Sequence, residues 1–288
     1  MENWRFGGIF HRGSEPIWEC PHLFRFGDRA VLFYSPSGPV QYVSGVLNEN
    51  GLSDVSCRGT VDYGGWEGYY ASTGFVDQED RRILLGWMPE GRGEGFPIPM
   101  DWSGALALPR LVDLKPNGAI AVSPIPELEA LRGDRRRWED LRVGPAPLHT
   151  GVYSSSFECS IEIEWPITEE NELIISMLVS DCGQERTELR LDFAAGTMVI
   201  DRSKSSLFPS VHKSSVIGKL SANDPFETLR LRIFVDQSVI EVFAGDQTCM
   251  TARVYPSLKD SNGIELRSSG EVLIKRMEIW EMKAAEIR

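Results

Sequence analysis

The chain has 288 residues, which is enough for one large or two ordinary domains with a substantial buried core. Its 42 acidic residues outnumber its 30 Lys and Arg, the net charge is −12, and no stretch gathers the basic side chains that neutralise phosphates, so a nucleic-acid partner is excluded. Glycine and proline, at 27 and 17 residues, divide the chain into short segments, which favours many strands over long helices.

The N-terminus and the cysteines indicate the compartment of the protein. Residues 1–10 lack the basic region and apolar run of a secretory signal, and the longest apolar run, residues 173–179, is too short to cross a bilayer. The five cysteines are odd in number and widely spaced, with no partner at zinc-binding spacing. They are Cys20, Cys57, Cys159, Cys182 and Cys249. We therefore expect a cytoplasmic chain with reduced thiols and without membrane association, metal or cofactor.

The first 120 residues have a strand-like pattern and are rich in tryptophan, glycine and proline. Five of the eight tryptophans lie here, namely Trp4, Trp18, Trp66, Trp87 and Trp102. Aromatic side chains beside glycine-rich loops suit a ligand cleft, although large aromatic side chains more often fill a core. Both interpretations stay open for the individual tryptophans.

Two loop-like segments in this part are expected to be turns and not binding loops. Residues 77–80 offer oxygen atoms in a row but lack the turn glycine of a calcium loop, so we expect a hairpin turn. Residues 91–95 resemble a phosphate loop, but the third glycine of G-x-G-x-x-G is missing and prolines follow where a helix would start. We expect a surface loop there.

The centre of the chain is the predicted boundary between two domains. Residues 124–132 can form one short helix, and residues 133–150 are first charged and then contain glycine and proline. The basic run Arg135–Arg137 is flanked by acidic residues, which indicates a solvated segment and not a binding patch. We predict a first domain over residues 1–132, a linker over 133–150 and a second domain over 151–288.

From residue 155 onward, apolar and polar residues alternate with a period of two, which is typical of half-buried strands. The short segment Asp236–Ser238 joins two strand-like runs into a predicted hairpin. Further strands are predicted at residues 188–193, 197–201, 251–255, 263–267 and 272–282. Many strands with turns between them predict a β-sandwich.

The candidate chemistry follows from what the sequence lacks and what it contains. The motifs G-x-x-x-x-G-K-[ST], G-x-S-x-G and H-E-x-x-H are absent. Carboxylates beside aromatic side chains remain, and sugar hydrolysis uses this combination because it needs an acid for the leaving oxygen and flat rings for the sugar face. Glu19 is the candidate acid, because Trp18, Cys20 and Pro21 would shield its carboxylate from water. An exposed glutamate before a turn is the alternative.

Residues 18–24, Trp-Glu-Cys-Pro-His-Leu-Phe, resemble the W-E-C-P-D-L-F segment of the glycoside hydrolase family of invertases, levanases and other β-fructosidases. Residues 62–64, 69–72 and 81–88 are similar to the D-Y-G, F-Y-A and R-R-I-L-x-G-W-M blocks of that family, in the same order and spacing. The similarity continues through residues 102–110, 124–132 and 232–243, so it extends over nearly the whole chain.

This resemblance implies an all-β protein in which a partial five-bladed β-propeller is followed by a β-sandwich. It implies that Glu19 is the general acid/base of a retaining two-carboxylate mechanism on terminal fructofuranosides such as sucrose or fructan. Asp62, Tyr70 and Trp87 are then expected to line the fructose site, whereas Trp102 is expected to pack. The implied partner is a fructose-containing saccharide.

One departure from the family affects the chemistry. Family members carry an N-D-P-N-G segment with the nucleophilic Asp and an R-D-P segment before the E-C-P block, and neither precedes Glu19 here. By resemblance, roughly the first two blades of the propeller are absent, so one carboxyl group of a pair that should stand about 5 to 5.5 Å apart is not encoded.

Three explanations account for this departure. The chain is a fragment or one product of a split gene, or it completes its propeller as a homo-oligomer or with a complementary N-terminal chain, because open strand edges tend to pair. In the third explanation it is a non-catalytic carbohydrate-binding protein or subunit. All three imply that the chain alone hydrolyses sucrose poorly.

Overall fold

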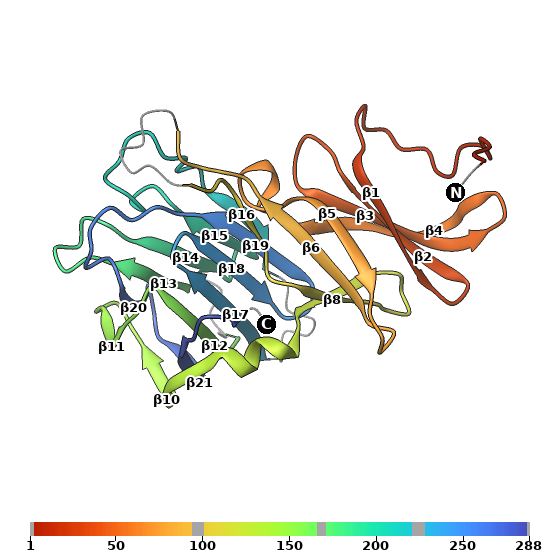
Figure 1. The fold of residues 1–288 in the computed structure, drawn as a ribbon. Helices are drawn as coiled ribbons and strands as arrows, with labels where there is room; N and C mark the ends of the chain where they lie inside the picture. The colour runs from red at the N-terminus through yellow and green to blue at the C-terminus, as the bar shows by residue number, and fades with distance from the viewer. Residues whose placement is uncertain (1–2, 94–100, 166–170, 221–227, 287–288) are drawn as a thin grey trace.

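The computed structural model describes residues 3–93, 101–165, 171–220 and 228–286 (Figure 1). Within these residues the structure is built almost entirely from strands, accompanied by two short 3-10 helices, η1 (Gly65–Glu67) and η2 (Pro126–Leu131). The all-β prediction is confirmed. No helix in the described ranges is long and apolar enough to span a membrane.

The N-terminal part contains two antiparallel sheets, as expected for propeller blades (Figure 1). The first has the order β1 (Glu19–Phe26), β2 (Arg29–Ser35), β3 (Val40–Asn48) and β4 (Gly51–Asp62). The second has the order β5 (Tyr70–Val76), β6 (Arg82–Met88), β8 (Arg110–Leu114) and β9 (Ile120–Pro124), and β7 (Ala105–Leu106) pairs with β6. The partial propeller is confirmed, with two blades in the described residues instead of the three that the resemblance implied.

The C-terminal part consists of two six-stranded antiparallel sheets, which confirms the predicted sandwich. One sheet has the order β10 (Arg132–Val143), β21 (Val272–Met282), β12 (Ser156–Glu164), β17 (Thr228–Asp236), β18 (Val239–Ala244) and β19 (Thr248–Arg253). The other has the order β11 (Leu148–Tyr153), β20 (Gly263–Ser268), β13 (Glu172–Val179), β14 (Thr187–Asp192), β15 (Thr197–Asp201) and β16 (Val216–Lys219).

Alternation in the sequence builds these sheets as predicted. In β12 the apolar residues Phe157, Ile161 and Ile163 point into the sandwich core, and polar residues between them take the other face. The hairpin of β17 and β18 pairs Asp236 with Val239, and Gln237 in the turn has a φ of 52°. A positive φ suits the tight turns that match the twist of a hairpin.

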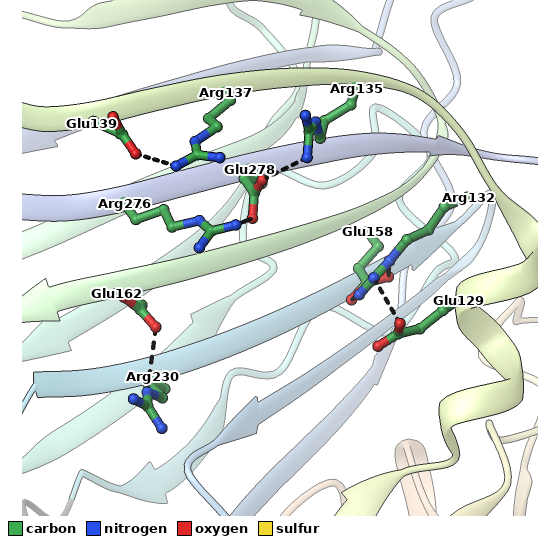
Figure 2. A network of polar contacts seen from close by, with 10 residues as sticks. All are labelled: Glu129, Arg132, Arg135, Arg137, Glu139, Glu158, Glu162, Arg230, Arg276 and Glu278. Atoms are coloured by element: carbon green, nitrogen blue, oxygen red, sulfur yellow. Dashed lines mark hydrogen bonds and ion pairs between the residues drawn. The ribbon is translucent and has the colours of Figure 1, made fainter.

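The predicted linker is wrong for most of its length. Residues 132–143 form β10, which pairs with β21 at the other end of the sequence, and residues 148–153 form β11. The sequence did not predict this strand because charged side chains occupy its exposed face. There Arg135 contacts Glu278 at 3.2 Å and Arg137 contacts Glu139 (Figure 2). The short helix expected at residues 124–132 is present as η2.

The two expected turns have different outcomes. Residues 77–80 connect β5 and β6, where the Asp77 backbone N–H donates to the Arg81 carbonyl at 3.0 Å, so the hairpin turn is confirmed. Residues 91–93 are not a free surface loop, because Gly91 is buried and Arg92 forms an isolated bridge with Val211 of the sandwich. Residues 94 and 95 of the same segment lie outside the described residues.

The blades and the sandwich share a hydrophobic core. Phe33, Tyr69 and Leu84 of the blades pack in one cluster with Phe234 and Phe243, which lie on the face of the β17–β18 hairpin that points away from the sandwich interior. The face of this sheet is therefore divided: the blades pack on β17 to β19, and most of the Arg and Glu side chains of Figure 2 lie on β10, β21 and β12, with Arg230 at the start of β17 and Glu129 on η2. The position of the blades is thus fixed by the sandwich.

Candidate functional site

Glu19 is the first residue of β1, and its side chain is exposed. The predicted shielding by its sequence neighbours is wrong, because Cys20 and Pro21 are exposed and the Trp18 ring stacks on Tyr34 with 3.8 Å between ring centroids. The contact that Glu19 makes comes instead from the neighbouring sheet, where the Tyr70 hydroxyl donates a hydrogen bond to Oε2 of Glu19 at 2.9 Å.

Tyr70 is the first residue of β5 and is 3% exposed. Its hydroxyl oxygen also lies 2.6 Å from the carbonyl oxygen of Pro36 and 3.2 Å from that of Ser35. Burial and the hydrogen bond to Glu19 raise the pKa of Tyr70 to about 12, so the phenol stays neutral at physiological pH. Its single hydrogen can therefore point to Glu19 or to Pro36, which lets the hydroxyl donate to an ionised Glu19 and accept from a protonated one.

Strands β1 and β5 begin with the same local geometry. Cys20 follows Glu19 with a φ of 47°, Ala71 follows Tyr70 with a φ of 48°, and the ladder of each strand is irregular at that point. Positive φ is uncommon for residues other than glycine, and bulges of this kind re-aim side chains near functional sites. The geometry brings the two polar side chains together at the starts of neighbouring strands.

Exposed aromatic rings surround this pair. Trp87 on β6 pairs with Tyr70 in the strand register and is 39% exposed. Trp66 on η1 is 56% exposed and makes edge contacts with both, at 4.8 Å from the Tyr70 ring and 5.8 Å from the Trp87 ring. Tyr70 thus joins the exposed Glu19 to a group of aromatic rings that includes Trp87 and Trp66.

Trp66 was missed as a site residue because its sequence signal is weak. It lies in the run Gly64-Gly-Trp-Glu-Gly68, where a large aromatic side chain stands among glycines. Such a residue cannot fill the core from a tight turn unless the turn is buried, so an exposed position for its ring could have been inferred.

Asp62 does not line this site, which corrects the prediction. It is fully buried and accepts hydrogen bonds from Arg110 at 2.8 Å, from the hydroxyl and backbone N–H of Thr251 at 2.7 and 3.1 Å, and from the Gly64 N–H at 2.6 Å. Arg110 also donates to Glu241 of β18 at 2.7 Å. The physical reason is topological, because β4 ends directly against β19 of the sandwich, where its last carboxylate meets polar groups and not solvent.

The charges in this buried cluster are held by one another. Burial alone would lower the pKa of Arg110, but the attraction of Asp62 and Glu241 outweighs burial and keeps the pKa well above its ordinary value. Burial raises the pKa of Glu241 against the attraction of Arg110. The cluster joins the blades to the sandwich and has no access to a substrate.

Trp102 lies apart from Glu19 and contacts two arginines. Its ring centroid is 5.0 Å from the Arg92 guanidinium and 5.8 Å from that of Arg253, which agrees with the expected packing role, although the side chain is 47% exposed. With Tyr255 it lines a pocket of about 460 Å³ between the blades and the sandwich.

Among the described residues, no three His, Cys, Asp or Glu side chains gather to hold a metal ion.

Comparisons with known proteins agree with the sequence motifs. The chain matches the models "Glycosyl hydrolases family 32 N-terminal domain" over residues 1–124 and "Glycosyl hydrolases family 32 C terminal" over residues 127–281. It is 31% identical to "Beta-fructofuranosidase, insoluble isoenzyme 1" of Oryza sativa subsp. indica, over 95% of this chain and 58% of that protein. It is 25% identical to "Levanase" of Bacillus subtilis, over 98% of this chain and 46% of that protein.

The fold is also similar to that of solved structures. The crystal structure of fructan 1-exohydrolase IIa from Cichorium intybus matches with a TM-score of 0.81 and 23% identity, over 93% of this chain and 62% of that one. The chain thus spans about half to three-fifths of the length of the proteins that it matches.

Proposed function

The chain belongs to glycosyl hydrolase family 32, and on that premise we propose that it is the acid/base-bearing part of a retaining β-fructofuranosidase. Its substrates are terminal fructofuranosides, such as those of sucrose or fructan. The observation that carries the proposal is the hydrogen bond of 2.9 Å between Tyr70 and the exposed Glu19, beside the exposed rings of Trp66 and Trp87.

Glu19 has the position that a general acid/base requires. In the first step of a retaining mechanism, a protonated Glu19 gives its proton to the glycosidic oxygen while an aspartate attacks the anomeric carbon and the bond to the leaving group breaks. In the second step, an ionised Glu19 takes a proton from water, whose oxygen attacks the anomeric carbon and releases the aspartate. The Tyr70 hydroxyl can serve both states because it can donate to the ionised carboxylate and accept from the protonated one.

The aromatic rings support a saccharide as the ligand. A sugar ring presents C–H groups on its faces, which pack well on flat aromatic side chains, while its hydroxyls need polar partners. Trp66 offers such a ring in contact with Tyr70, the partner of Glu19, and Trp87 offers a second ring in contact with Trp66. The name of the rice relative, a β-fructofuranosidase, supports a fructose-containing saccharide.

The retaining mechanism also needs a nucleophilic aspartate opposite Glu19. We propose that segments of the N-D-P-N-G and R-D-P type supply it from a neighbouring blade, within one polypeptide, from a partner chain or through oligomerisation. Exposed apolar side chains near the first sheet support such a contact: Trp4 and Phe6 are each 84% exposed, and Leu23 on the edge strand β1 is 37% exposed. Sedimentation at micromolar concentration tests this part, and a compact monomer that binds no hydrophobic dye contradicts it.

A second candidate is a non-catalytic carbohydrate-binding protein or subunit, favoured by the exposed rings of Trp66 and Trp87, which suit saccharide binding with or without a reaction. Hydrolysis of sucrose separates the two candidates. We expect little turnover by the chain alone and clear turnover once a complementary chain supplies the aspartate. Saccharide binding without turnover in the reconstituted protein favours the second candidate.

We also propose that the protein resides in the cytoplasm. The five cysteines are all free, which supports a reducing, cytoplasmic environment. Alkylation of intact cells followed by mass spectrometry of the protein tests it, and disulfides between these cysteines would contradict it.

A further inference from the structure

The turn between β4 and β5, residues 64–68, sits directly on the sandwich. A Cβ atom added to Gly64 would lie 2.4 Å from the carbonyl oxygen of Thr251 on β19, and one added to Gly68 would lie 2.0 Å from the same atom. Only glycine allows the two backbones to approach so closely. Within residues 61–70, Trp66 is the one residue whose side chain is exposed. The turn is therefore an anchored support for a single exposed ring.

A second anchor is ionic and lies beside the tryptophan. Nη2 of Arg202, which follows β15 of the sandwich, donates to Oε2 of Glu67 at 2.7 Å, and the Ser214 hydroxyl donates to the same oxygen. Arg202 is 1% exposed, and its other nitrogens donate to the carbonyl oxygens of Ser214 at 2.7 Å and Arg253 at 2.8 Å. Because its guanidinium is held on three sides, Arg202 fixes Glu67 in one place.

The anchored turn ends next to the candidate acid. Trp66 precedes Glu67 in the sequence, its ring contacts Tyr70 at 4.8 Å, and Tyr70 donates to Glu19. Trp66, which is 56% exposed, contacts the 39% exposed Trp87 at 5.8 Å, so the two rings form one exposed apolar surface on a rigid support. Such a surface marks a binding site, and its order is established before the ligand arrives. Contacts therefore connect Arg202 of the sandwich to Glu67, and the neighbouring Trp66 to Tyr70 and Glu19.

We propose that Trp66 contacts the bound saccharide beside Glu19, and that the sandwich residue Arg202 positions Trp66 through Glu67. The inference rests on the proposed function for the class of ligand, a fructose-containing saccharide. It gives the sandwich an indirect part in saccharide binding, because a change of the Arg202 contact displaces the turn and with it the ring that packs on the sugar.

The test uses the full chain labelled with 5-fluorotryptophan and sucrose as the probe. The ¹⁹F signal of Trp66 is assigned from its absence in Trp66→Phe. We expect sucrose to shift this signal, and Trp66→Ala to weaken sucrose binding at least about tenfold. Glu67→Ala should shift or broaden the Trp66 signal in the absence of sucrose and weaken binding several-fold. Glu67→Gln should restore part of both, since its amide oxygen can still accept from Arg202.

The matched control is Lys115→Ala, which removes another ion pair between a blade and the sandwich, Lys115 to Asp246 at 2.7 Å, and should change neither the signal nor the affinity. An unchanged Trp66 signal in Glu67→Ala overturns the positioning role. Sucrose binding that shifts other tryptophan signals but not that of Trp66 overturns the contact and leaves the proposed function standing. A wild-type chain that binds no sucrose contradicts both the contact and the proposed function.

Discussion

Asp62 and Glu19 are two carboxylates of the same sheet with opposite surroundings. Asp62 ends the edge strand β4, is fully buried and accepts four hydrogen bonds, including two from Thr251 and one from Arg110. Glu19 begins β1, at the opposite edge of the sheet, is exposed and accepts one hydrogen bond, from the neutral Tyr70. Both stand in segments that resemble family motifs, and the resemblance implied that both face the fructose site, which the structure corrects for Asp62.

The difference shows what each carboxylate can do. A buried carboxylate that is paired with an arginine and fully hydrogen-bonded is costly to protonate or disturb, so Asp62 stabilises the contact between the blades and the sandwich. An exposed carboxylate with one adaptable partner can gain and lose a proton during a reaction, so Glu19 suits acid/base chemistry. Four measurements test this difference between the exposed site and the buried contact of the blades with the sandwich.

The largest effect is expected at Glu19. Glu19→Gln should reduce sucrose turnover of the reconstituted protein by roughly 10² to 10⁴-fold, because an amide cannot donate or accept the proton. The loss should be smallest for substrates whose leaving group needs no protonation. Initial rates measure this, with Glu79→Gln in the exposed β5–β6 turn as the control. Wild-type turnover in Glu19→Gln would refute the acid assignment.

The next effect is on stability and concerns the buried cluster. Arg110→Met should lower the free energy of unfolding by about 3 to 5 kcal/mol, since it leaves the carboxylates of Asp62 and Glu241 buried without their cation. Urea denaturation measures it. Lys115→Ala, which removes a partly exposed ion pair, should cost at most about 1 kcal/mol. Equal effects of the two variants would contradict the structural role of the cluster.

A smaller effect is expected at Tyr70. Tyr70→Phe keeps the ring but removes the hydroxyl that bonds Glu19, so turnover should fall about tenfold, the value of one hydrogen bond of about 1.4 kcal/mol. Sucrose affinity should change little because the contacts among the aromatic rings are retained. Saturation kinetics on the reconstituted protein separate the two quantities. A loss confined to affinity would place Tyr70 in substrate binding alone.

The smallest effect concerns the loss of stability at acid pH. It tests whether this loss depends on ionisable groups at the contact between the blades and the sandwich. Burial alone would raise the pKa of Glu90, but hydrogen bonds from Arg92 and Tyr255 outweigh it and lower the pKa to about 2. The folded-state pKa lies below the unfolded value, so this stabilisation is complete above about pH 4.5 and is lost as the pH falls toward 2.

Thermal unfolding between pH 5 and 2.5 measures this loss. Glu90→Gln should show a shallower decline of the unfolding temperature than the wild type, because it has no carboxylate to protonate. A decline in Glu90→Gln as steep as that of the wild type would contradict this role of Glu90.

Local patterns in the sequence were sufficient for much of the fold. The period-two alternation of β12 and the turn at Asp236–Ser238 depend on residues within a few positions of one another, and both are found as predicted. The same holds for the turn between β5 and β6. The contact of Glu19 with Tyr70, and the pairing of Tyr70 with Trp87 in the strand register, agree with the resemblance, which carried information on distant residues that alternation does not contain.

Tertiary structure alone decided what each acidic or aromatic side chain faces. The partner of Asp62, Thr251, lies 189 residues away, so no local pattern could predict its burial. The sequence did not predict strand β10, because its charged residues show no strand pattern. The strand forms because it pairs with β21, a distant segment of the chain. Trp66 became a site residue through Arg202 and β19, which seat its turn on the sandwich. Alternation and turns are local properties of the chain, whereas burial and pairing depend on which distant segments the fold brings into contact.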